Sequence, residues 1–231
     1  MKLSIIFPAY NEEKRLLPVL KEYYSFFYSK LNNDFELIVI PNNSTDKTFE
    51  IARDFSLGKT NILVKNISHY VGKGGAVMKG FELAKGDYIG FVDADESTSP
   101  EEFFKLYSNI GQNHGIIGSR RVAGAIVEPK RKFSKRVGSF GFYFVSKILF
   151  GWSYKDTQCG AKIFRNDVAK YFPEKIVEKG WIFDIDLLYL CKKNNWEIKE
   201  FPIRWVDDEG SHISNLDGVI SVLKLIRYKF N

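Results

Sequence analysis

The first 120 residues of this chain alternate between two kinds of segment, and this alternation limits the possible folds most. Short, continuously apolar runs, typical of strands buried on both faces of a parallel sheet, are followed by longer segments of helical character. The predicted strands are 3–7, 35–40, 61–65, 88–92 and 115–119, and the predicted helices are about 17–31, 45–55, 74–86 and 100–110. This order predicts an α/β fold with a doubly wound, mostly parallel sheet and helices on both faces. Ser44 or Thr45 is expected to cap the second helix.

The second half of the chain is less regular. It is expected to contain a basic loop at 128–136, an aromatic helix at 137–150, a loop at 156–164 that enters a strand, a helix at 180–194, a strand within 197–214 and a basic helix at 216–230. No repeat, low-complexity tract or linker divides residues 1–231, so a single domain is expected.

Charge and apolar patterning restrict the partners and the compartment. The 34 Lys and Arg residues exceed the 28 Asp and Glu residues, which favours an anionic ligand or surface, and no nucleic-acid partner is expected. Two cysteines are too few for a disulfide framework or a cysteine-rich zinc site. The longest apolar region, 137–152, is interrupted by Lys147 and is shorter than the roughly 20 residues that span a bilayer. A cytoplasmic protein, peripheral to the membrane, is therefore expected.

Polar loops follow three of the predicted strands: "PAYNE" after the first, "PNNSTD" after the second and "DADES" after the fourth. Ligands of doubly wound sheets bind at the carboxyl ends of the strands, so these loops should converge on one cleft. In the third loop, Asp93 and Asp95 share one side of the extended chain, with Ala94 pointing away. Two carboxylates this close repel each other unless a cation or a proton lies between them. The pair is a candidate metal site, and a solvated turn that caps the next helix is the alternative.

The ordered motifs "PAYNEE", "NNSTDKT", "GKGGAVMKG" and "DADES" resemble the nucleotide-sugar-binding half of family 2 inverting glycosyltransferases with a GT-A fold. "GSR" (118–120), "DTQCGAKIF", "WIFDIDLL" and "RWVDDEGSHIS" extend the resemblance over nearly the whole chain, toward the branch that glycosylates polyprenyl phosphates such as dolichyl phosphate. The resemblance implies a nucleotide-sugar-binding half at 1–120 and an acceptor-binding half at 121–231. It also implies Mg²⁺ or Mn²⁺ as the cofactor, a UDP-glucose or GDP-mannose type of donor, and a polyprenyl phosphate acceptor at the membrane surface.

The resemblance assigns roles to the matched residues. Asp95 would be catalytic and ligate the cation across the diphosphate, and Asp93 would contact the ribose or the metal. The other residues implied in nucleotide-sugar binding are Pro8, Ala9, Tyr10, Glu12, Asn42, Lys73, Gly74 and Ala94. The acceptor phosphate would be held by Arg120, Arg131, Ser134 and Arg136, because arginine forks match phosphate oxygens.

Asp184 is implied as the second catalytic residue. It would position the sugar or the phosphate acceptor, or serve as general base if the acceptor were a hydroxyl group. Asp186 follows two residues later, so on a helix the two carboxylates should diverge, one toward the cleft and the other toward solvent or a cap.

The chain departs from the family pattern in the loop after the second strand. Where relatives commonly have "DDGS", this chain has "PNNS", so that Asn42 replaces the acid that contacts the nucleobase. An amide can both donate and accept a hydrogen bond, whereas a carboxylate only accepts, so the nucleobase preference stays open. Two other functions also stay open: transfer to a sugar hydroxyl in glycan synthesis, and non-catalytic nucleotide-sugar binding.

Overall fold

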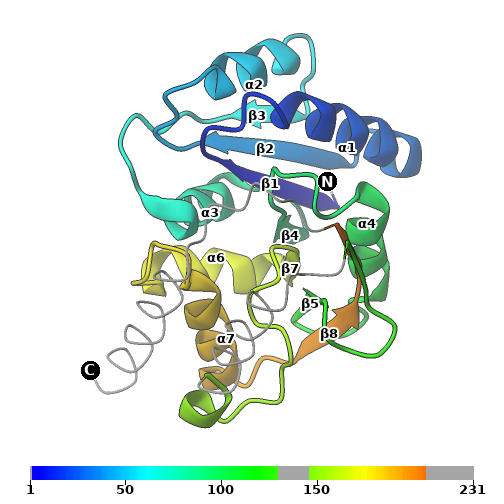
Figure 1. Cartoon of the computed structure of the whole chain (residues 1–231), viewed down its shortest axis with the longest axis vertical. Coiled ribbons are helices and arrows are strands. Elements are labelled where there is room, and N and C mark those ends of the chain that lie inside the picture. The colour runs from blue at the N-terminus through cyan, green and yellow to red at the C-terminus, as the bar shows by residue number, and fades with distance from the viewer. Residues whose placement is uncertain (1, 130–145, 207–231) are drawn as a thin grey trace.

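The structure is a computed structural model that describes residues 2–129 and 146–206. These residues form a seven-stranded sheet in the order β3-β2-β1-β4-β7-β5-β8. The strands are β1 (Leu3–Ala9), β2 (Phe35–Pro41), β3 (Ile62–Val64), β4 (Tyr88–Phe91), β5 (Gly115–Ser119), β7 (Lys162–Arg165) and β8 (Ile198–Pro202). Figure 1 shows the sheet running through the molecule from β3 to β8.

The predicted α/β fold with a mostly parallel sheet is confirmed. β1 pairs in parallel with β2 and β4, and β5 pairs in parallel with β8. β7 is antiparallel to both of its neighbours, β4 and β5, which the sequence did not predict. The chain adds β2 and then β3 on one side of β1, and it then returns to place β4 on the other side of β1. The loops that follow β1 and β4 therefore lead in opposite directions at the boundary between these two strands. Such a switch point is where ligands of doubly wound sheets bind.

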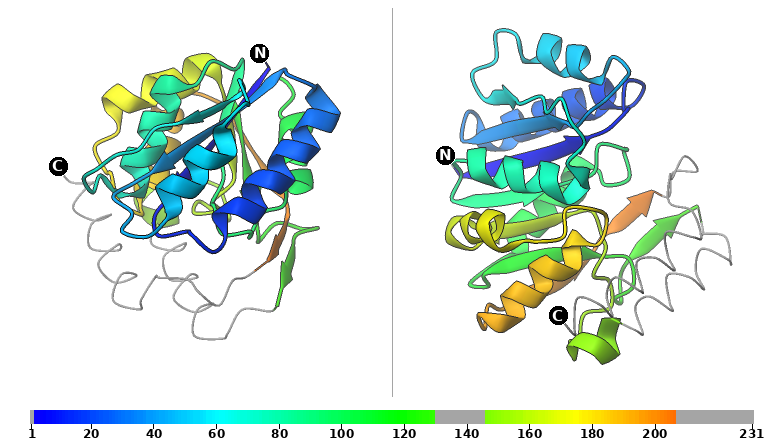
Figure 2. Two further views of the ribbon diagram at one scale, coloured as in Figure 1. Left: turned by 90° about the horizontal axis from the view of Figure 1, so that it is seen from above. Right: turned by 90° about the vertical axis from the view of Figure 1, so that its left-hand side faces the viewer.

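Helices cover both faces of the sheet (Figure 2). One face carries α1 (Leu16–Leu31), α2 (Thr48–Ser56) and α4 (Pro100–Asn109), and the other carries α3 (Gly72–Leu83), α6 (Asn166–Lys175) and α7 (Phe183–Lys193). The alternation of side chains along β1 serves both layers, since Ile5 and Phe7 pack with the first set and Ile6 with the second. All three side chains are fully buried.

A second, two-stranded parallel sheet joins β6 (Ile126–Glu128) to β9 (Arg204–Val206). Two backbone amides attach β9 to the region after β4: the Val206 amide donates to the Ser97 carbonyl at 3.0 Å, and the Arg204 amide donates to the Glu102 carboxylate at 2.9 Å. This attachment brings Trp205 close to the "DADES" loop, although the two are more than 100 residues apart in the sequence.

Several sequence expectations differ from the structure. Helix α2 begins at Thr48, and neither Ser44 nor Thr45 caps it, because the Ser44 hydroxyl accepts the Asn11 amide and Asp46 accepts the Thr48 amide instead. Strand β6 and helix α6 were not predicted. The expected helix at 216–230 and most of that at 137–150 lie outside the described residues. Within 2–129 and 146–206, no helix is both long and apolar enough to cross a membrane.

Candidate active site

The loops that follow β1 and β2 are joined by hydrogen bonds at the carboxyl edge of the sheet. The Asn11 amide donates to the Ser44 hydroxyl at 3.2 Å, and the Thr45 amide donates to the Asn11 side chain at 2.9 Å. The Glu12 amide donates to the Thr48 hydroxyl at 2.7 Å. Asn11 adopts a positive φ of 55°, a conformation that asparagine tolerates better than most residues. The two loops therefore form one rigid wall beside the end of β4.

The carboxylate pair lies directly after β4. Asp93 Oδ1 is 2.5 Å from the Lys73 ammonium, and its Oδ2 lies against Gly160, where an added Cβ would be 2.1 Å away. Asp95 accepts the Ser97 amide at 3.1 Å. Burial and the neighbouring charge of Asp93 raise the pKa of Asp95. The site therefore holds concentrated negative charge at the switch point.

Lys73 lies in the first turn of α3 and points at this charge. Its ammonium also lies over the Trp181 ring, 5.2 Å from the centroid. Burial lowers the pKa of Lys73, but the charges of Asp93 and Asp184 outweigh the burial and raise it. Lys73 is thus a cation set among carboxylates that come from both halves of the chain.

The donor set fits a hard divalent cation. Mg²⁺ and Mn²⁺ in phosphate-handling sites commonly use one or two carboxylates, with phosphate oxygens and waters completing the shell. Asp93 and Asp95 supply such a pair, and the Lys73 ammonium on Asp93 shows that this position accepts positive charge. Among the described residues, no group of three or more His, Cys, Asp or Glu side chains could enclose a metal ion. A cation here would therefore depend on the ligand for the rest of its shell.

Asp184 pairs with Lys162, a residue that the sequence analysis missed. The Lys162 ammonium lies 2.5 Å from Asp184 Oδ1 and donates to the Cys159 carbonyl at 2.6 Å, and its side chain is fully buried. It also lies over the Phe91 ring, at 5.5 Å. Lysine within the apolar strand segment "AKIF" was the available signal, because a buried lysine requires an anionic partner. The pairing fixes the Asp184 carboxylate in one position.

Asp184 and Asp186 bind different segments, as expected for diverging carboxylates, but the expectation that one of them faces solvent or a cap needs correction. Both residues are buried, with exposures of 3% and 2%. Asp186 faces neither solvent nor its own helix end, since it accepts the Glu178 amide from the preceding loop at 2.9 Å. Both acids in the first turns of α7 are therefore tied to other segments.

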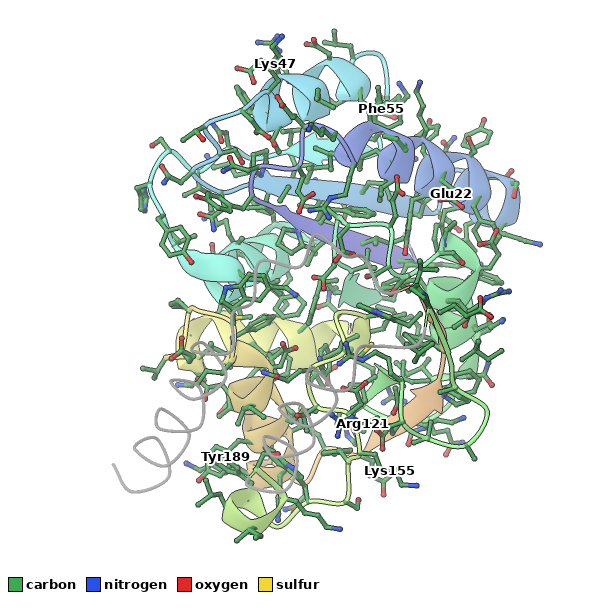
Figure 3. The ribbon with its side chains drawn as sticks, in the orientation of Figure 1. Glu22, Lys47, Phe55, Arg121, Lys155 and Tyr189 are labelled. Atoms are coloured by element: carbon green, nitrogen blue, oxygen red, sulfur yellow. The ribbon has the colours of Figure 1, made fainter. Side chains whose placement is uncertain are left out.

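Arg120 has a different partner from the expected acceptor phosphate. Its guanidinium forms a two-pronged contact with Asp156, with Nε 2.6 Å and Nη2 2.8 Å from the carboxylate oxygens, and it stacks over Trp205 at 4.9 Å. Burial raises the pKa of Asp156, but Arg120 overcomes this and holds that pKa well below its usual range. Arg121, labelled in Figure 3, adds further positive charge beside Asp156. Asp156 thus binds the Nε and Nη2 groups of Arg120, and phosphate binding by Arg120 stays a prediction.

Asn42 and Gly74 both make close contacts within the protein. The Asn42 carbonyl oxygen accepts the Val71 amide and its amino group donates to the Gly72 carbonyl, each at 3.1 Å. This buried amide therefore fastens the loop before α3 through both of its ends, and its expected nucleobase contact stays a prediction. Gly74 packs against α7, since an added Cβ would lie 2.6 Å from the Phe183 Cβ. Gly74 thus allows α3 to pack closely on α7, and its part in nucleotide binding stays a prediction.

The remaining residues predicted to bind the nucleotide sugar lie near the ends of β1 and β4. Pro8 and buried Ala9 pair with β2, and buried Ala94 lies between the two aspartates. Tyr10 is exposed and meets Tyr70 edge to face at 6.2 Å.

Glu12 binds Arg15 at 2.7 Å. Burial raises the pKa of Glu12 to about 7, despite Arg15 and with added contributions from Asp95 and Asp93. The β1 loop and the carboxylate pair therefore share one electrostatic environment. Three predicted phosphate ligands, Arg131, Ser134 and Arg136, lie outside the described residues.

Solved structures with the same architecture define the class of fold. Glucosyl-3-phosphoglycerate synthase from Mycobacterium tuberculosis, in complex with UDP, superposes with a TM-score of 0.70 at 16% identity, over 97% of this chain and 79% of that one. S. aureus TarS 1–349, in complex with UDP-GlcNAc, gives 0.63 at 20% identity, over 99% and 66%. The fold is that of the GT-A transferases.

Sequence comparison then gives the family. The profile of Glycosyl transferase family 2 matches residues 4–172, and the chain belongs to this family and is a glycosyltransferase. Similar relatives include the dolichyl-phosphate beta-glucosyltransferases of Dictyostelium discoideum (33% identical, over 99% of this chain and 74% of the relative) and Drosophila melanogaster (35%, over 93% and 70%). The Saccharomyces cerevisiae protein of the same name is 32% identical, over 92% of this chain and 69% of the relative.

Proposed function

We propose that this chain transfers glucose from UDP-glucose to dolichyl phosphate. The observation that carries the proposal is its similarity to dolichyl-phosphate beta-glucosyltransferases, at 32–35% identity over 92–99% of its length. Binding of UDP or UDP-sugar by proteins of the same fold supports the choice of donor nucleotide. The acceptor would be met at the cytoplasmic surface of a membrane.

The donor would lie with its diphosphate toward the end of β4. Asp93 and Asp95 would hold a divalent cation, Mg²⁺ or Mn²⁺, whose chemistry is to stabilise the negative charge that develops on the leaving diphosphate. The complex of the M. tuberculosis synthase with Mn²⁺ and UDP-glucose supports this choice. Lys73 adds a further cation beside the diphosphate, and the exposed Tyr10 and Tyr70 offer aromatic faces for the nucleoside.

The reaction joins an oxygen of the acceptor phosphate to the anomeric carbon of glucose. As this bond forms, the bond from that carbon to the diphosphate oxygen breaks on the opposite face, so an α-linked donor gives a β-linked product. A phosphate oxygen is already ionised and needs no general base. This agrees with Asp184, whose Oδ1 is bound by Lys162 and whose side chain is nearly inaccessible. Asp184, held in place by Lys162, would position the sugar or the acceptor, and a sugar hydroxyl acceptor that relied on Asp184 as base is disfavoured.

The test is transfer of label from UDP-[¹⁴C]glucose into the organic phase by the full chain, with dolichyl phosphate and Mg²⁺ or Mn²⁺. GDP-[¹⁴C]mannose serves as the competing donor. Transfer should require the metal and the lipid, should be lost in Asp95→Asn, and should persist in Asp54→Asn, which removes an exposed carboxylate on α2. Retained transfer in Asp95→Asn, or transfer to glycans alone, would contradict the proposal.

A further inference from the structure

Lys73 occupies the place on Asp93 that a divalent cation would take. The ammonium lies 2.5 Å from Asp93 Oδ1, and both side chains are largely withdrawn from solvent, at 14% and 20% exposure. A contact of this length between two shielded charges is a strong, charge-assisted hydrogen bond. It is also the kind of contact that a metal–carboxylate bond would have to replace.

Lys73 cannot easily leave through a shift of its backbone. The Asn42 side chain holds the amide of residue 71 and the carbonyl of Gly72, and Gly72 adopts a φ of +73° directly against the Lys179 carbonyl. The Gly75 amide donates to the same Lys179 carbonyl at 3.1 Å. The start of α3 is therefore fixed on both sides of Lys73, and only the four-carbon side chain is free to turn.

Other groups that could accept the ammonium lie beside its present position. Trp181 offers its ring face at 5.2 Å, and Asp184 is, after Asp93, the carboxylate whose charge acts most strongly on Lys73. A rotation of the side chain would release Asp93 and still leave the ammonium beside an aromatic face, a carboxylate and an incoming diphosphate. The displaced cation therefore need not become buried without a partner.

We propose that Lys73 is an internal counter-ion of the carboxylate pair, which releases Asp93 only when a divalent cation arrives together with the nucleoside diphosphate. This inference rests on the function proposed above, and it adds that binding of the divalent cation and binding of the nucleoside diphosphate are coupled. Without nucleotide, Lys73 competes for Asp93 and keeps metal affinity low. When the nucleotide binds, its phosphates give the Lys73 ammonium a new partner and complete the coordination shell of the divalent cation. The cation and the nucleotide therefore bind together.

The test is Mn²⁺ binding to the full chain, measured by the EPR signal of free Mn²⁺ with and without UDP. Lys73→Met should bind Mn²⁺ alone about ten- to a hundredfold more tightly than wild type, the factor that a charge-assisted hydrogen bond contributes. Its gain in Mn²⁺ affinity on addition of UDP should shrink accordingly. Lys79→Met is the matched control, because it removes a lysine from the same helix whose partner, Glu82, is exposed; its Mn²⁺ affinity should equal that of wild type.

The Mn²⁺ titrations separate failure of this inference from failure of the proposed function. Unchanged or weaker binding of Mn²⁺ alone to Lys73→Met, with wild type still binding Mn²⁺ in the presence of UDP, overturns the inference and leaves the proposed function standing. Failure of wild type to bind Mn²⁺ even with UDP overturns the metal–nucleotide basis of the proposed function itself. If Lys73→Met is unfolded by circular dichroism, Lys73→Gln and Lys73→Arg decide. The neutral glutamine should raise the affinity for Mn²⁺, and the arginine should leave it low.

Discussion

Replacing Lys162 with methionine tests the buried ion pair that holds Asp184. Methionine fills most of the volume of the lysine stem but removes the ammonium, so the Asp184 carboxylate and the Cys159 carbonyl lose a donor at 2.5 and 2.6 Å. Removing one partner of a buried pair costs about 3–5 kcal/mol, because the other charge stays buried and uncompensated. Lys162 is fully buried, so the upper part of that range applies. Since a domain is typically stable by only about 5–15 kcal/mol, this loss is a large share of the total.

The measurement is the free energy of unfolding from guanidinium titrations of the full chain. Three variants complete a cycle: Lys162→Met, Asp184→Asn, and the two together. The double variant should be more stable than Lys162→Met alone, because asparagine removes the uncompensated charge, and the coupling should exceed about 1 kcal/mol. Lys79→Met, which breaks an exposed pair, should change stability by less than about 1 kcal/mol.

Two results would refute this reasoning. A loss below about 1 kcal/mol in Lys162→Met would mean that Asp184 is hydrated or neutral and that the pair is not truly buried. Strict additivity in the double variant would mean that the two side chains act independently, despite the 2.5 Å contact.

Three further changes test the rest of the site. Gly160→Ala places a methyl group 2.1 Å from Asp93 Oδ2, so transfer should fall about a hundredfold from misplacement of that carboxylate, and wild-type kcat/KM would contradict the geometry. Arg120 outweighs burial and lowers the pKa of Asp156 below its ordinary 3.8. The Asp156 carboxylate therefore stabilises the fold fully at neutral pH, and this stabilisation is lost as the pH falls below 3.8. The difference in Tm between wild type and Asp156→Asn should accordingly shrink in acid. Burial raises the pKa of Glu12 from 4.5 to about 7. As the pH rises from 4.5 to about 7, wild type should therefore lose stability relative to Glu12→Gln, measured as Tm against pH.

Local patterns predicted the parts of the fold that local physics determines. Strands β1, β2 and β4 are mostly apolar runs that are largely buried, and polar residues follow shortly after each one ends. The position of Asp93 and Asp95 at the carboxyl edge of the sheet followed from this alone. Helix α6 was missed because Pro173 lies inside it and weakens the helical pattern.

Features that depend on contacts between residues distant in the sequence could not be predicted from local patterns. Nothing within "KIFR" requires β7 to lie antiparallel between β4 and β5, since that position depends on which strand edges remain open after folding. In the same way, the sequence shows an amide at position 42, but the binding of Asn42 to residues 71 and 72 depends on a contact across about 30 positions. The pairing of Arg120 with Asp156 could not be predicted either, because the two residues are 36 positions apart.

The charges of the site cross the expected boundary between a donor half at 1–120 and an acceptor half at 121–231. Asp93 belongs to the first half, yet its carboxylate is confined by Gly160 of the second, and Lys73 lies under the charges of both Asp93 and Asp184. Lys162 then connects Asp184 back to the Phe91 ring at the end of β4. The two carboxylate–lysine pairs therefore form one connected network, in which a change of charge at the donor side alters the surroundings of Asp184. Donor binding and acceptor positioning should for this reason be coupled, and variants at Lys73 and Lys162 should be non-additive in kcat/KM.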